Sequence, residues 1–358
     1  MGRIVGVKGS RVARGATMRW GAWLCAALVM ATTCAAWAQS GGSGGKNGGN
    51  TANAPAGKSG GSSGNGENVS NMTLSDLVNE AVAWRLPLLS ILSAAVIVML
   101  VAGDVLRPGA VKRHGVRDVK PLAWPVWLFG GLVVFLSFAL LPATIAQMGW
   151  LIGPDPNSAR AQATIAGITY LCAGLFALGM VHLAKRSAPN AGFTMGLVDL
   201  MNGVGCFVLA VPIVLLTAVG AEWLHTELTG KAPSALGHPT LVAIVDNQSN
   251  VWGWILIAVV VIGAPLVEEV IYRGFMQSAI LRATGSVVAS IGITSVVFVA
   301  SHIGWTGDEL SIPWHALATI FVLGLCMGIA MERTKRLGVP IAMHACFNAM
   351  NVAIALAA

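Results

Sequence analysis

Residues 251–281 read VWGWILIAVVVIGAPLVEEVIYRGFMQSAIL, an apolar run that contains two adjacent acids, Glu268 and Glu269. A helix of roughly 20 apolar residues crosses the hydrocarbon core of a bilayer, which is about 30 Å thick. This run is longer, so its helix must tilt, kink near Gly263 and Pro265, or project into the cytoplasm. The stretch therefore predicts a membrane-spanning helix with carboxylates at membrane depth.

The rest of the chain has the same apolar character. Of its 358 residues, 55% are hydrophobic and only 10% are charged, whereas soluble domains carry roughly 25% charged residues. We therefore predict an all-α, polytopic membrane bundle of about eight transmembrane helices. The expected spans are 86–104, 122–145, 164–184, 199–220, 251–281, 286–302, 313–331 and 338–357.

Lysines and arginines gather in every second connection between these spans. They are Arg107, Lys112, Arg113, Arg117, Lys120, Lys185, Arg186, Arg282, Arg333, Lys335 and Arg336. Because short basic loops stay in the cytoplasm, we expect these connections to be cytoplasmic and the mature N-terminus to lie outside. The expected location is a bacterial inner or plasma membrane.

The formal net charge of +7 does not indicate nucleic-acid binding, because no basic stripe with interleaved aromatic residues runs along any segment. The expected partners are the lipid bilayer and a membrane-associated peptide or protein substrate. The six cysteines include no CxxC pair, so neither a disulfide framework nor a structural zinc site is indicated.

The segment ahead of the first span has two parts. Residues 1–38 are typical of a signal peptide, because three arginines precede an apolar run that ends in a small-x-small site at Ala38. An uncleaved signal anchor is the alternative, and the long basic region suggests Met18 as the true start. Residues 39–71 are rich in Gly, Ser and Asn, a composition that predicts a disordered arm.

The two glutamates of the fifth span are expected to have different roles. Consecutive helical residues lie about 100° apart, so the two side chains cannot share a face. Glu269 and Arg273 are spaced i, i+4 and can form a salt bridge, whereas Glu268 lies on the stripe of Tyr272 and is expected to face a cavity. In the alternative interpretation, Arg273 snorkels to the interface and both acids lie among lipid headgroups.

Histidines in later spans reach a similar depth. If the chain reverses near Gly285, Glu269 lies about 16 residues before the turn and His302 about 17 after it, so the two lie level in a hairpin. His344 and Asn348 share one face of the last span. His344 is only about six residues into that span, so either the last helix begins deep or the cavity opens toward the cytoplasm.

These residue types can activate water for hydrolysis. Glu268 can take a proton from water, and His302 can orient the same water or protonate a leaving amine. His344 and Asn348 can donate hydrogen bonds to a developing oxyanion. Alternatively, Glu268, His302 and His344 bind a divalent metal such as zinc. The chain has no HExxH pair, and the sequence leaves both mechanisms open.

Three motifs in separate spans carry a family resemblance. They are EExxxR at Glu268–Arg273, FxxxH at Phe298–His302 and HxxxN at His344–Asn348. In this order they resemble the CAAX-protease and bacteriocin-processing (CPBP, Abi) family of intramembrane peptidases, over roughly residues 250–358. Members of that family cleave prenylated proteins near the C-terminus, or act in bacteriocin maturation and self-immunity.

The resemblance implies an intramembrane endopeptidase with a Glu/His site, and a metalloprotease is the class that we expect from it. The implied catalytic residues are Glu268, His302, His344 and Asn348, and the implied supporting residues are Glu269, Arg273, Phe298 and Tyr272. Residues 72–198 are then N-terminal transmembrane helices, and residues 199–358 form the CAAX-protease-like catalytic membrane domain.

Two other functions fit the same residues. One is a non-catalytic immunity or scaffold protein that keeps the polar core of the family for folding. The other is a proton-coupled carrier that uses the buried carboxylates as a relay. Four further histidines lie at span ends or in connections and are interpreted as incidental; they are His182, His225, His238 and His315.

Overall fold

A computed structural model describes residues 74–357, apart from 108, 154, 156–157, 231–238, 304, 307–308 and 311–312. The predicted signal peptide and the Gly-rich arm lie outside the described residues. Within them, seven helices are long and apolar enough to cross a membrane. The chain is thus an integral membrane protein with an all-α fold, as the sequence predicts.

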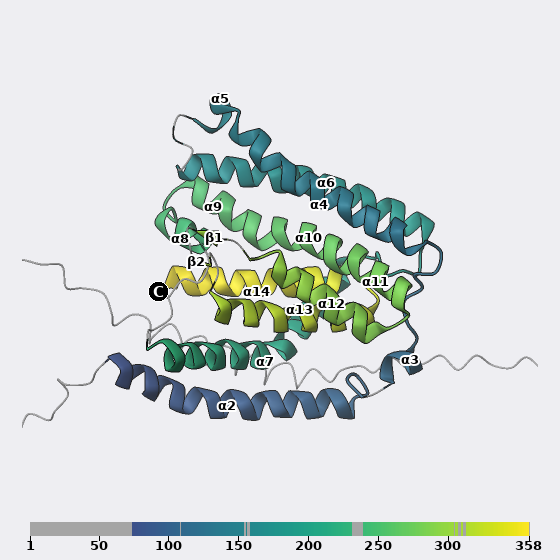
Figure 1. Cartoon of the computed structure of the whole chain (residues 1–358), viewed down its shortest axis with the longest axis horizontal. Coiled ribbons are helices and arrows are strands. Elements are labelled where there is room, and N and C mark those ends of the chain that lie inside the picture. The colour runs from purple at the N-terminus through teal and green to yellow at the C-terminus, as the bar shows by residue number, and fades with distance from the viewer. Residues whose placement is uncertain are drawn as a thin grey trace, which may run out of the picture.

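The long helices run roughly along one axis of the molecule (Figure 1). They are α2 (Leu74–Ala102), α4 (Trp124–Ala146), α6 (Ala159–Ser187), α7 (Leu197–Thr229), a continuous helix over residues 251–284, α13 (Trp314–Thr334) and α14 (Gly338–Ala357). Short helices α3 (Ala110–His114), α5 (Gly149–Ile152) and α8 (Pro239–Asp246) lie in the connections. The two-residue strands β1 (Trp305–Thr306) and β2 (Glu309–Leu310) pair antiparallel.

The sixth predicted span, 286–302, is shorter than expected. It forms α12 (Val287–Ala300), which has 14 residues and is therefore about 21 Å long, less than the thickness of a bilayer core. Before it, Gly285 adopts a left-handed conformation (φ 66°) and ends the preceding helix, which confirms the predicted reversal. The side chain of Ser286 then accepts a hydrogen bond from the backbone amide of Ala289 and caps the start of α12.

The fifth predicted span is a continuous helix from Val251 to Thr284. Its parts are α9 (Val251–Ala258), the π-helical segment η1 (Val259–Gly263), α10 (Ala264–Glu269), the π-helical segment η2 (Val270–Met276) and α11 (Gln277–Thr284). Gly263 and Pro265 therefore do not end the helix; a π-helical turn accommodates them. π-Helical turns of this kind frequently mark functional sites.

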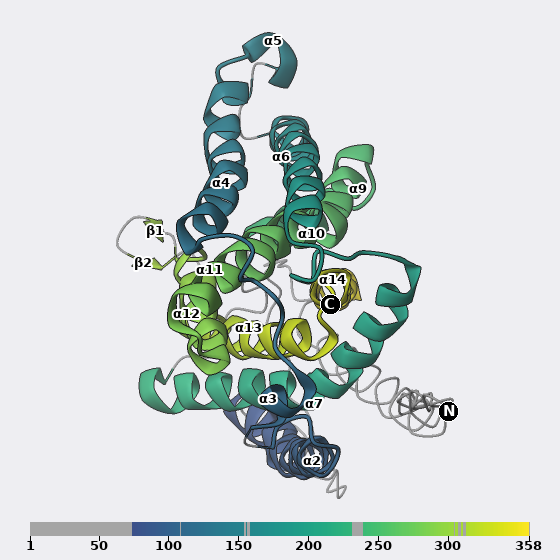
Figure 2. The ribbon, with the colours of Figure 1, turned by 90° about the vertical axis from the view of Figure 1, so that its right-hand side faces the viewer.

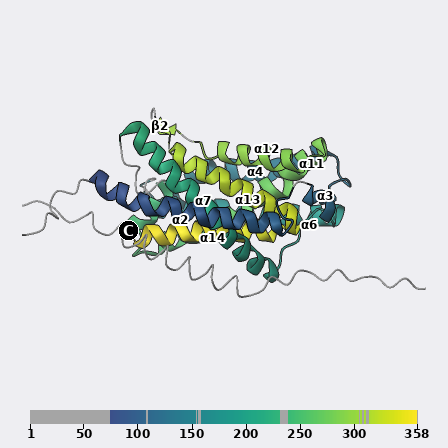
Figure 3. The same ribbon diagram turned by 90° about the horizontal axis from the view of Figure 1, so that it is seen from below.

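The helices form a bundle around α10, α13 and α14. Viewed along its axis, α4 and α6 lie on one side, and α7 and α2 on the other (Figure 2). The helix α7 packs against α2, α13 and α14, and seen from below it crosses α2 at an angle (Figure 3). Gly203 permits the contact of α7 with α14, because a methyl group at that position would overlap Ala342.

The last helix begins deep in the bundle. His344, six residues after the start of α14, contacts Glu269, which lies fifteen residues before the end of α11. For antiparallel helices this offset places the start of α14 roughly 14 Å deeper than the end of α11. Figure 1 shows α11 extending well beyond α14 on that side. Of the two expectations for His344, the deep start is the one observed.

Candidate active site

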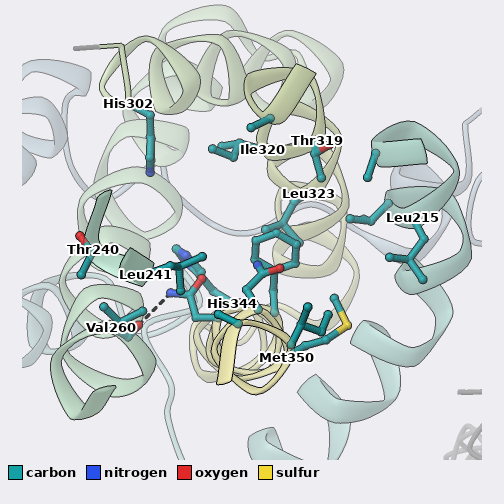
Figure 4. Close-up of a pocket in the computed structure, with 18 of the residues that line it drawn as sticks. Leu215, Thr240, Leu241, Val260, His302, Thr319, Ile320, Leu323, His344 and Met350 are labelled. Carbon is teal, nitrogen blue, oxygen red and sulfur yellow. Dashed lines mark hydrogen bonds between the residues drawn. The ribbon is translucent and has the colours of Figure 1, made fainter. Parts of the chain in front are cut away.

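A cavity of about 440 Å³ lies inside the bundle. Its walls come from α2, α6, α7, α8, α9, α10, α12, α13 and α14. All four predicted catalytic residues line it; they are Glu268, His302, His344 and Asn348. Figure 4 shows His302 reaching into the cavity from the wall opposite His344. The fold therefore brings residues from three separate motifs to one enclosed space.

Glu268 is the acid that faces the cavity, as the sequence predicts. Its Oε2 atom is buried and has no hydrogen-bond partner among the described residues. A buried carboxylate oxygen without a partner is costly in a protein interior. Glu268 is therefore placed to accept a hydrogen bond from a molecule in the cavity.

Glu269 faces the protein interior and is fully buried. Its Oε1 atom accepts from Nη1 of Arg273 at 3.1 Å and is paired with Nδ1 of His344 at 2.9 Å. The salt bridge to Arg273 confirms the i, i+4 prediction. Because Glu269 and Arg273 are both 0% exposed, the interpretation in which Arg273 snorkels and the acids lie among headgroups is wrong.

The contact with Glu269 also orients His344. A carboxylate accepts hydrogen bonds, so Nδ1 of His344 carries the proton in this pair. The ring is held in one orientation, and Nε2 is the nitrogen left for the cavity that His344 lines. A carboxylate that fixes the tautomer of a histidine in this way is a common device of functional sites.

His302 is oriented by the backbone of its own helix. Its Nδ1 lies 2.7 Å from the carbonyl oxygen of Phe298, so Nδ1 donates and the neutral ring keeps its lone pair on Nε2. Since His302 lines the cavity with Glu268, the cavity contains a carboxylate oxygen and an imidazole nitrogen that can both accept a proton.

Asn348 is held by a carbonyl that Pro265 leaves unbonded. In η1 the amide of Ala264 donates to the carbonyl of Val259, which is the i→i−5 spacing of a π-helix. The next amide in that register would bond the carbonyl of Val260, but Pro265 has no N–H. Nδ2 of Asn348 donates to this carbonyl instead, at 2.8 Å (Figure 4, dashed line). One amide hydrogen of Asn348 is therefore used for positioning.

Phe298 lies at the centre of the motif residues and is 1% exposed. Its ring centroid is 4.7 Å from that of His302 and 5.8 Å from that of His344, and both pairs are edge-to-face. The guanidinium carbon of Arg273 lies 4.4 Å from the same centroid, and Tyr272 packs edge-on at 5.1 Å. Phe298 thus contacts both histidines and packs against Tyr272 and Arg273, two of the three supporting residues of the first motif.

A second polar layer lies one helical turn beyond Arg273. Nε2 of Gln277 donates to the carbonyl of Gly328 at 3.2 Å and to Oε1 of Glu332 at 2.8 Å. Nη2 and Nε of Arg117 donate to the same Glu332 oxygen at 2.6 and 2.9 Å. Arg117 lies in a basic connection but is only 3% exposed, so it is a buried structural residue as well as a marker of topology.

Two glycines of α13 allow these polar side chains to approach. Nη2 of Arg273 donates to the carbonyl of Gly324 at 3.1 Å, and Gln277 contacts Gly328 as described. A methyl group would lie 3.4 Å from Arg273 Nη2 at position 324, and 2.9 Å from Ile291 at position 328. The Gly324–Gly328 spacing therefore resembles the small-xxx-small pattern that brings membrane helices together.

The predicted metal ligands do not form a closed set. Across the described part of the chain, no three His, Cys, Asp or Glu side chains converge on a position that could hold a metal ion. His344 uses Nδ1 for Glu269, which leaves Nε2 as the nitrogen it could offer to a cation. A metal ion held by Glu268, His302 and His344 therefore stays a prediction from the sequence.

Several residues that line the cavity were not expected there. His315 is the second residue of α13, lines the cavity and packs against the ring of His225 at 4.9 Å between centroids. Arg85 and Glu222 line it as well and interact electrostatically. From the sequence, His225 and His315 are interpreted as incidental residues at span ends or in connections. Their contact is missed because the predicted fourth span ends at residue 220, whereas α7 continues to Thr229 and so includes His225.

A curated protein of Escherichia coli is similar to part of the chain. Over 132 residues the chain is 27% identical to an uncharacterized 24.3 kDa protein of Escherichia coli, which covers 36% of this chain and 58% of that relative. The chain thus spans less than two thirds of the length of this relative. No solved structure matches the chain at a significant level.

The family model of the type II CAAX prenyl endopeptidases, Rce1-like, matches residues 250–350. This range contains all three motifs and the helices from α9 to most of α14. The match confirms the family that the motifs predict. The similarity of this membrane protein to the Rce1-like, type II CAAX prenyl endopeptidase family thus lies in residues 250–350.

Proposed function

We propose that the protein is an intramembrane endopeptidase that hydrolyses a peptide bond with water activated by Glu268 and His302. One observation carries the proposal. The unpartnered, buried Oε2 of Glu268 belongs to a residue that lines the same cavity as His302 and His344. Isolated acids at membrane depth are functional candidates because their burial is costly.

In the proposed reaction, Glu268 accepts a proton from a water molecule as the water oxygen attacks the carbonyl carbon of the substrate. Nε2 of His302 accepts a hydrogen bond from the same water and orients it. The C–O bond forms, the C–N bond breaks, and the proton held by Glu268 passes to the departing amine. The products are a carboxylic acid, which keeps the second proton of the water, and an amine, with one water consumed; transfer of that proton from the acid to the amine then gives a carboxylate and an ammonium group.

The oxyanion of the tetrahedral intermediate needs donors in a site that excludes most water. We assign this role to His344 and to the amide hydrogen of Asn348 that does not bond Val260. Glu269 stabilises positive charge on His344 when the ring carries two protons, and the ring then donates from Nε2. Glu269, Arg273 and Phe298 act as positioning residues that fix the two histidines. Zinc bound by Glu268, His302 and His344 is the alternative source of an activated water.

The test compares variants of the reconstituted protein. Isolated bacterial membranes serve as the substrate source, and new N-termini are counted by mass spectrometry. Glu268→Gln and His302→Ala are each expected to lower product formation by at least roughly 100-fold, the usual contribution of general acid–base catalysis. Glu227→Gln and His182→Ala change the same residue types outside the cavity and are expected to keep the product pattern.

Equal product patterns for wild type, Glu268→Gln and His302→Ala would remove the catalytic assignment. In that case a non-catalytic immunity or scaffold protein and a proton-coupled carrier are the remaining interpretations. We also propose that the protein lies in a bacterial inner membrane, because its basic connections suit a cytoplasmic side. A membrane-associated polypeptide is the proposed substrate, because the walls of the cavity are largely apolar.

A further inference from the structure

The cavity occupies only one half of the bundle. Along the fully described helix 251–284, the lining residues run from Leu256 to Glu268, and none lies between Glu269 and Thr284. Along α14 they begin at His344 and continue toward the C-terminal end at Ala355. These two helices run in opposite directions, so both place the cavity on the same side of Glu268.

The other long helices agree. The lining residues of α7 are Val214, Leu215, Ala218, Val219 and Glu222, all in its second half. Those of α13 lie in its first part, between His315 and Leu323. Wherever a described helix lines the cavity, its lining residues lie toward the end of the bundle that carries α8, opposite the end that carries α3 and the end of α11 (Figure 1).

The opposite end is closed by packed side chains. The rings of Trp127 and Phe193 stack at 5.6 Å, and Phe275 packs against both. These three residues are at most 3% exposed. The buried layer of Gln277, Glu332 and Arg117 lies at the same end. Together they separate the floor of the cavity from that face of the molecule.

The closed end also carries the basic connections. Among the described residues they include Arg107, Arg113, Arg117, Lys120, Lys185, Arg186, Arg282, Arg333, Lys335 and Arg336. Clusters of Lys and Arg beside membrane helices remain on the cytoplasmic side. The closed end of the bundle is therefore assigned to the cytoplasm, and the cavity extends from the middle of the membrane toward the outer face.

We infer that the site takes its substrate from the non-cytoplasmic side of the membrane. The substrate class is then an exported polypeptide, or the outer part of a membrane-anchored one. This inference rests on the proposed function for the identity of the substrate, but the direction of access rests on cavity placement and charge alone. Arg85 lies at the start of the apolar span of α2 (Trp84–Ala102) and Glu222 in the last third of α7, and both supply charged groups on the side where such a chain would enter.

The test measures the accessibility of the cavity without requiring cleavage. Thr319→Cys and Asn351→Cys place thiols on two different walls of the cavity, and Ser187→Cys places one at the exposed end of α6 on the basic side. Intact cells and inside-out vesicles are treated with a membrane-impermeant, positively charged methanethiosulfonate. The parent protein, with its own cysteines, sets the background.

We expect the two cavity thiols to react in intact cells and the Ser187→Cys thiol to react only in inside-out vesicles. Reaction of the cavity thiols only in inside-out vesicles, or in neither preparation, would overturn the inference. Repeating the labelling in a Glu268→Gln background separates the two proposals. Outer labelling that persists without any detectable peptidase activity supports outward access while removing the catalytic assignment.

Discussion

Nδ1 of His344 lies 2.9 Å from Oε1 of Glu269, and this contact joins the first motif to the last across 75 residues of sequence. The same oxygen accepts the guanidinium of Arg273. The second glutamate of the EExxxR motif is therefore shared between two nitrogen donors, and its proposed task is to hold His344 in place. The first glutamate faces the cavity and is left for chemistry.

Glu269→Gln is the sharpest test of this positioning role. Glutamine keeps the shape of the side chain but removes the charge that holds both Arg273 and His344. We expect kcat to fall by roughly 10–100-fold, as is usual when a partner behind a functional histidine is lost, while KM changes little. Steady-state kinetics on a cleaved peptide identified from membranes gives both constants.

The control for Glu269→Gln is the exposed Glu227→Gln, which is expected to leave both constants unchanged. Thermal unfolding in detergent is measured in parallel, because removing one partner of a buried ion pair costs about 3–5 kcal/mol. A folded Glu269→Gln protein with wild-type kcat would contradict the positioning role.

Phe298→Leu tests the aromatic contact between the two histidines. Leucine stays apolar but removes the ring face under Arg273 and the edge-to-face contacts with His302 and His344. Each aromatic pair contributes about 0.5–1.5 kcal/mol, and a desolvated cation–π contact about 2 kcal/mol. We expect a lower free energy of unfolding, by about 2–4 kcal/mol, and a lower kcat at temperatures where the variant is fully folded.

A matched substitution in the same helix is Val296→Ala, which shortens an exposed residue and should leave stability nearly unchanged. If Phe298→Leu lowers stability but keeps the wild-type kcat, Phe298 contributes to packing alone and does not position the histidines.

Features that depend on neighbouring residues could be predicted from the sequence, whereas features that depend on tertiary packing could not. The spans, the turn at Gly285 and the Glu269–Arg273 pair follow from hydrophobicity and helical spacing, and each was predictable. The contact of His344 with Glu269 depends on how deep α14 begins, which tertiary packing decides. Glu222 was missed because α7 is longer than its apolar run.

Arg117 is a second residue whose environment could not be predicted from the sequence. Its neighbours form a basic connection that the positive-inside rule predicts to be cytoplasmic, and a basic residue in such a connection is expected to be solvated. In the fold it is buried and bonds Glu332, which is 215 residues away. No periodicity in the sequence links the two positions, so the pair becomes visible only when the helices are assembled.

The Arg117–Glu332 pair predicts strong coupling in stability. Both side chains are fully buried and Nη2 lies 2.6 Å from Oε1, so removing one partner leaves an uncompensated charge. We expect Arg117→Met and Glu332→Leu each to lower the free energy of unfolding by about 3–5 kcal/mol. The loss of unfolding free energy in the double variant should be clearly smaller than the sum of the two single losses, because the double variant removes both charges. Denaturation in detergent measures the free energy of unfolding of all four proteins. Additive losses in this double-mutant cycle would contradict the pairing.

Pro265→Ala tests the link between the π-helical turn and the site. Alanine restores an amide N–H beside the carbonyl of Val260, which Asn348 now bonds. We expect the new amide to compete for that carbonyl and to release Asn348, lowering kcat while the helix itself becomes no less stable. Asn348→Ala should have a similar effect on kcat, and the two substitutions combined should be less than additive. Full activity of Pro265→Ala would show that Asn348 does not depend on the missing amide.

Chelation distinguishes the two proposed sources of an activated water. Because no three candidate ligands converge in the described part of the chain, we propose proton transfer from water to Glu268, with His302 orienting the water, as the source that needs no metal. We expect peptidase activity to persist after prolonged treatment with EDTA or o-phenanthroline, and metal analysis of the active protein to show less than one zinc per chain. Loss of activity that returns on adding zinc, together with loss of bound zinc in Glu268→Gln, would instead assign these three residues as ligands. The same measurement on His182→Ala controls for zinc held at exposed histidines, since that side chain lies outside the cavity.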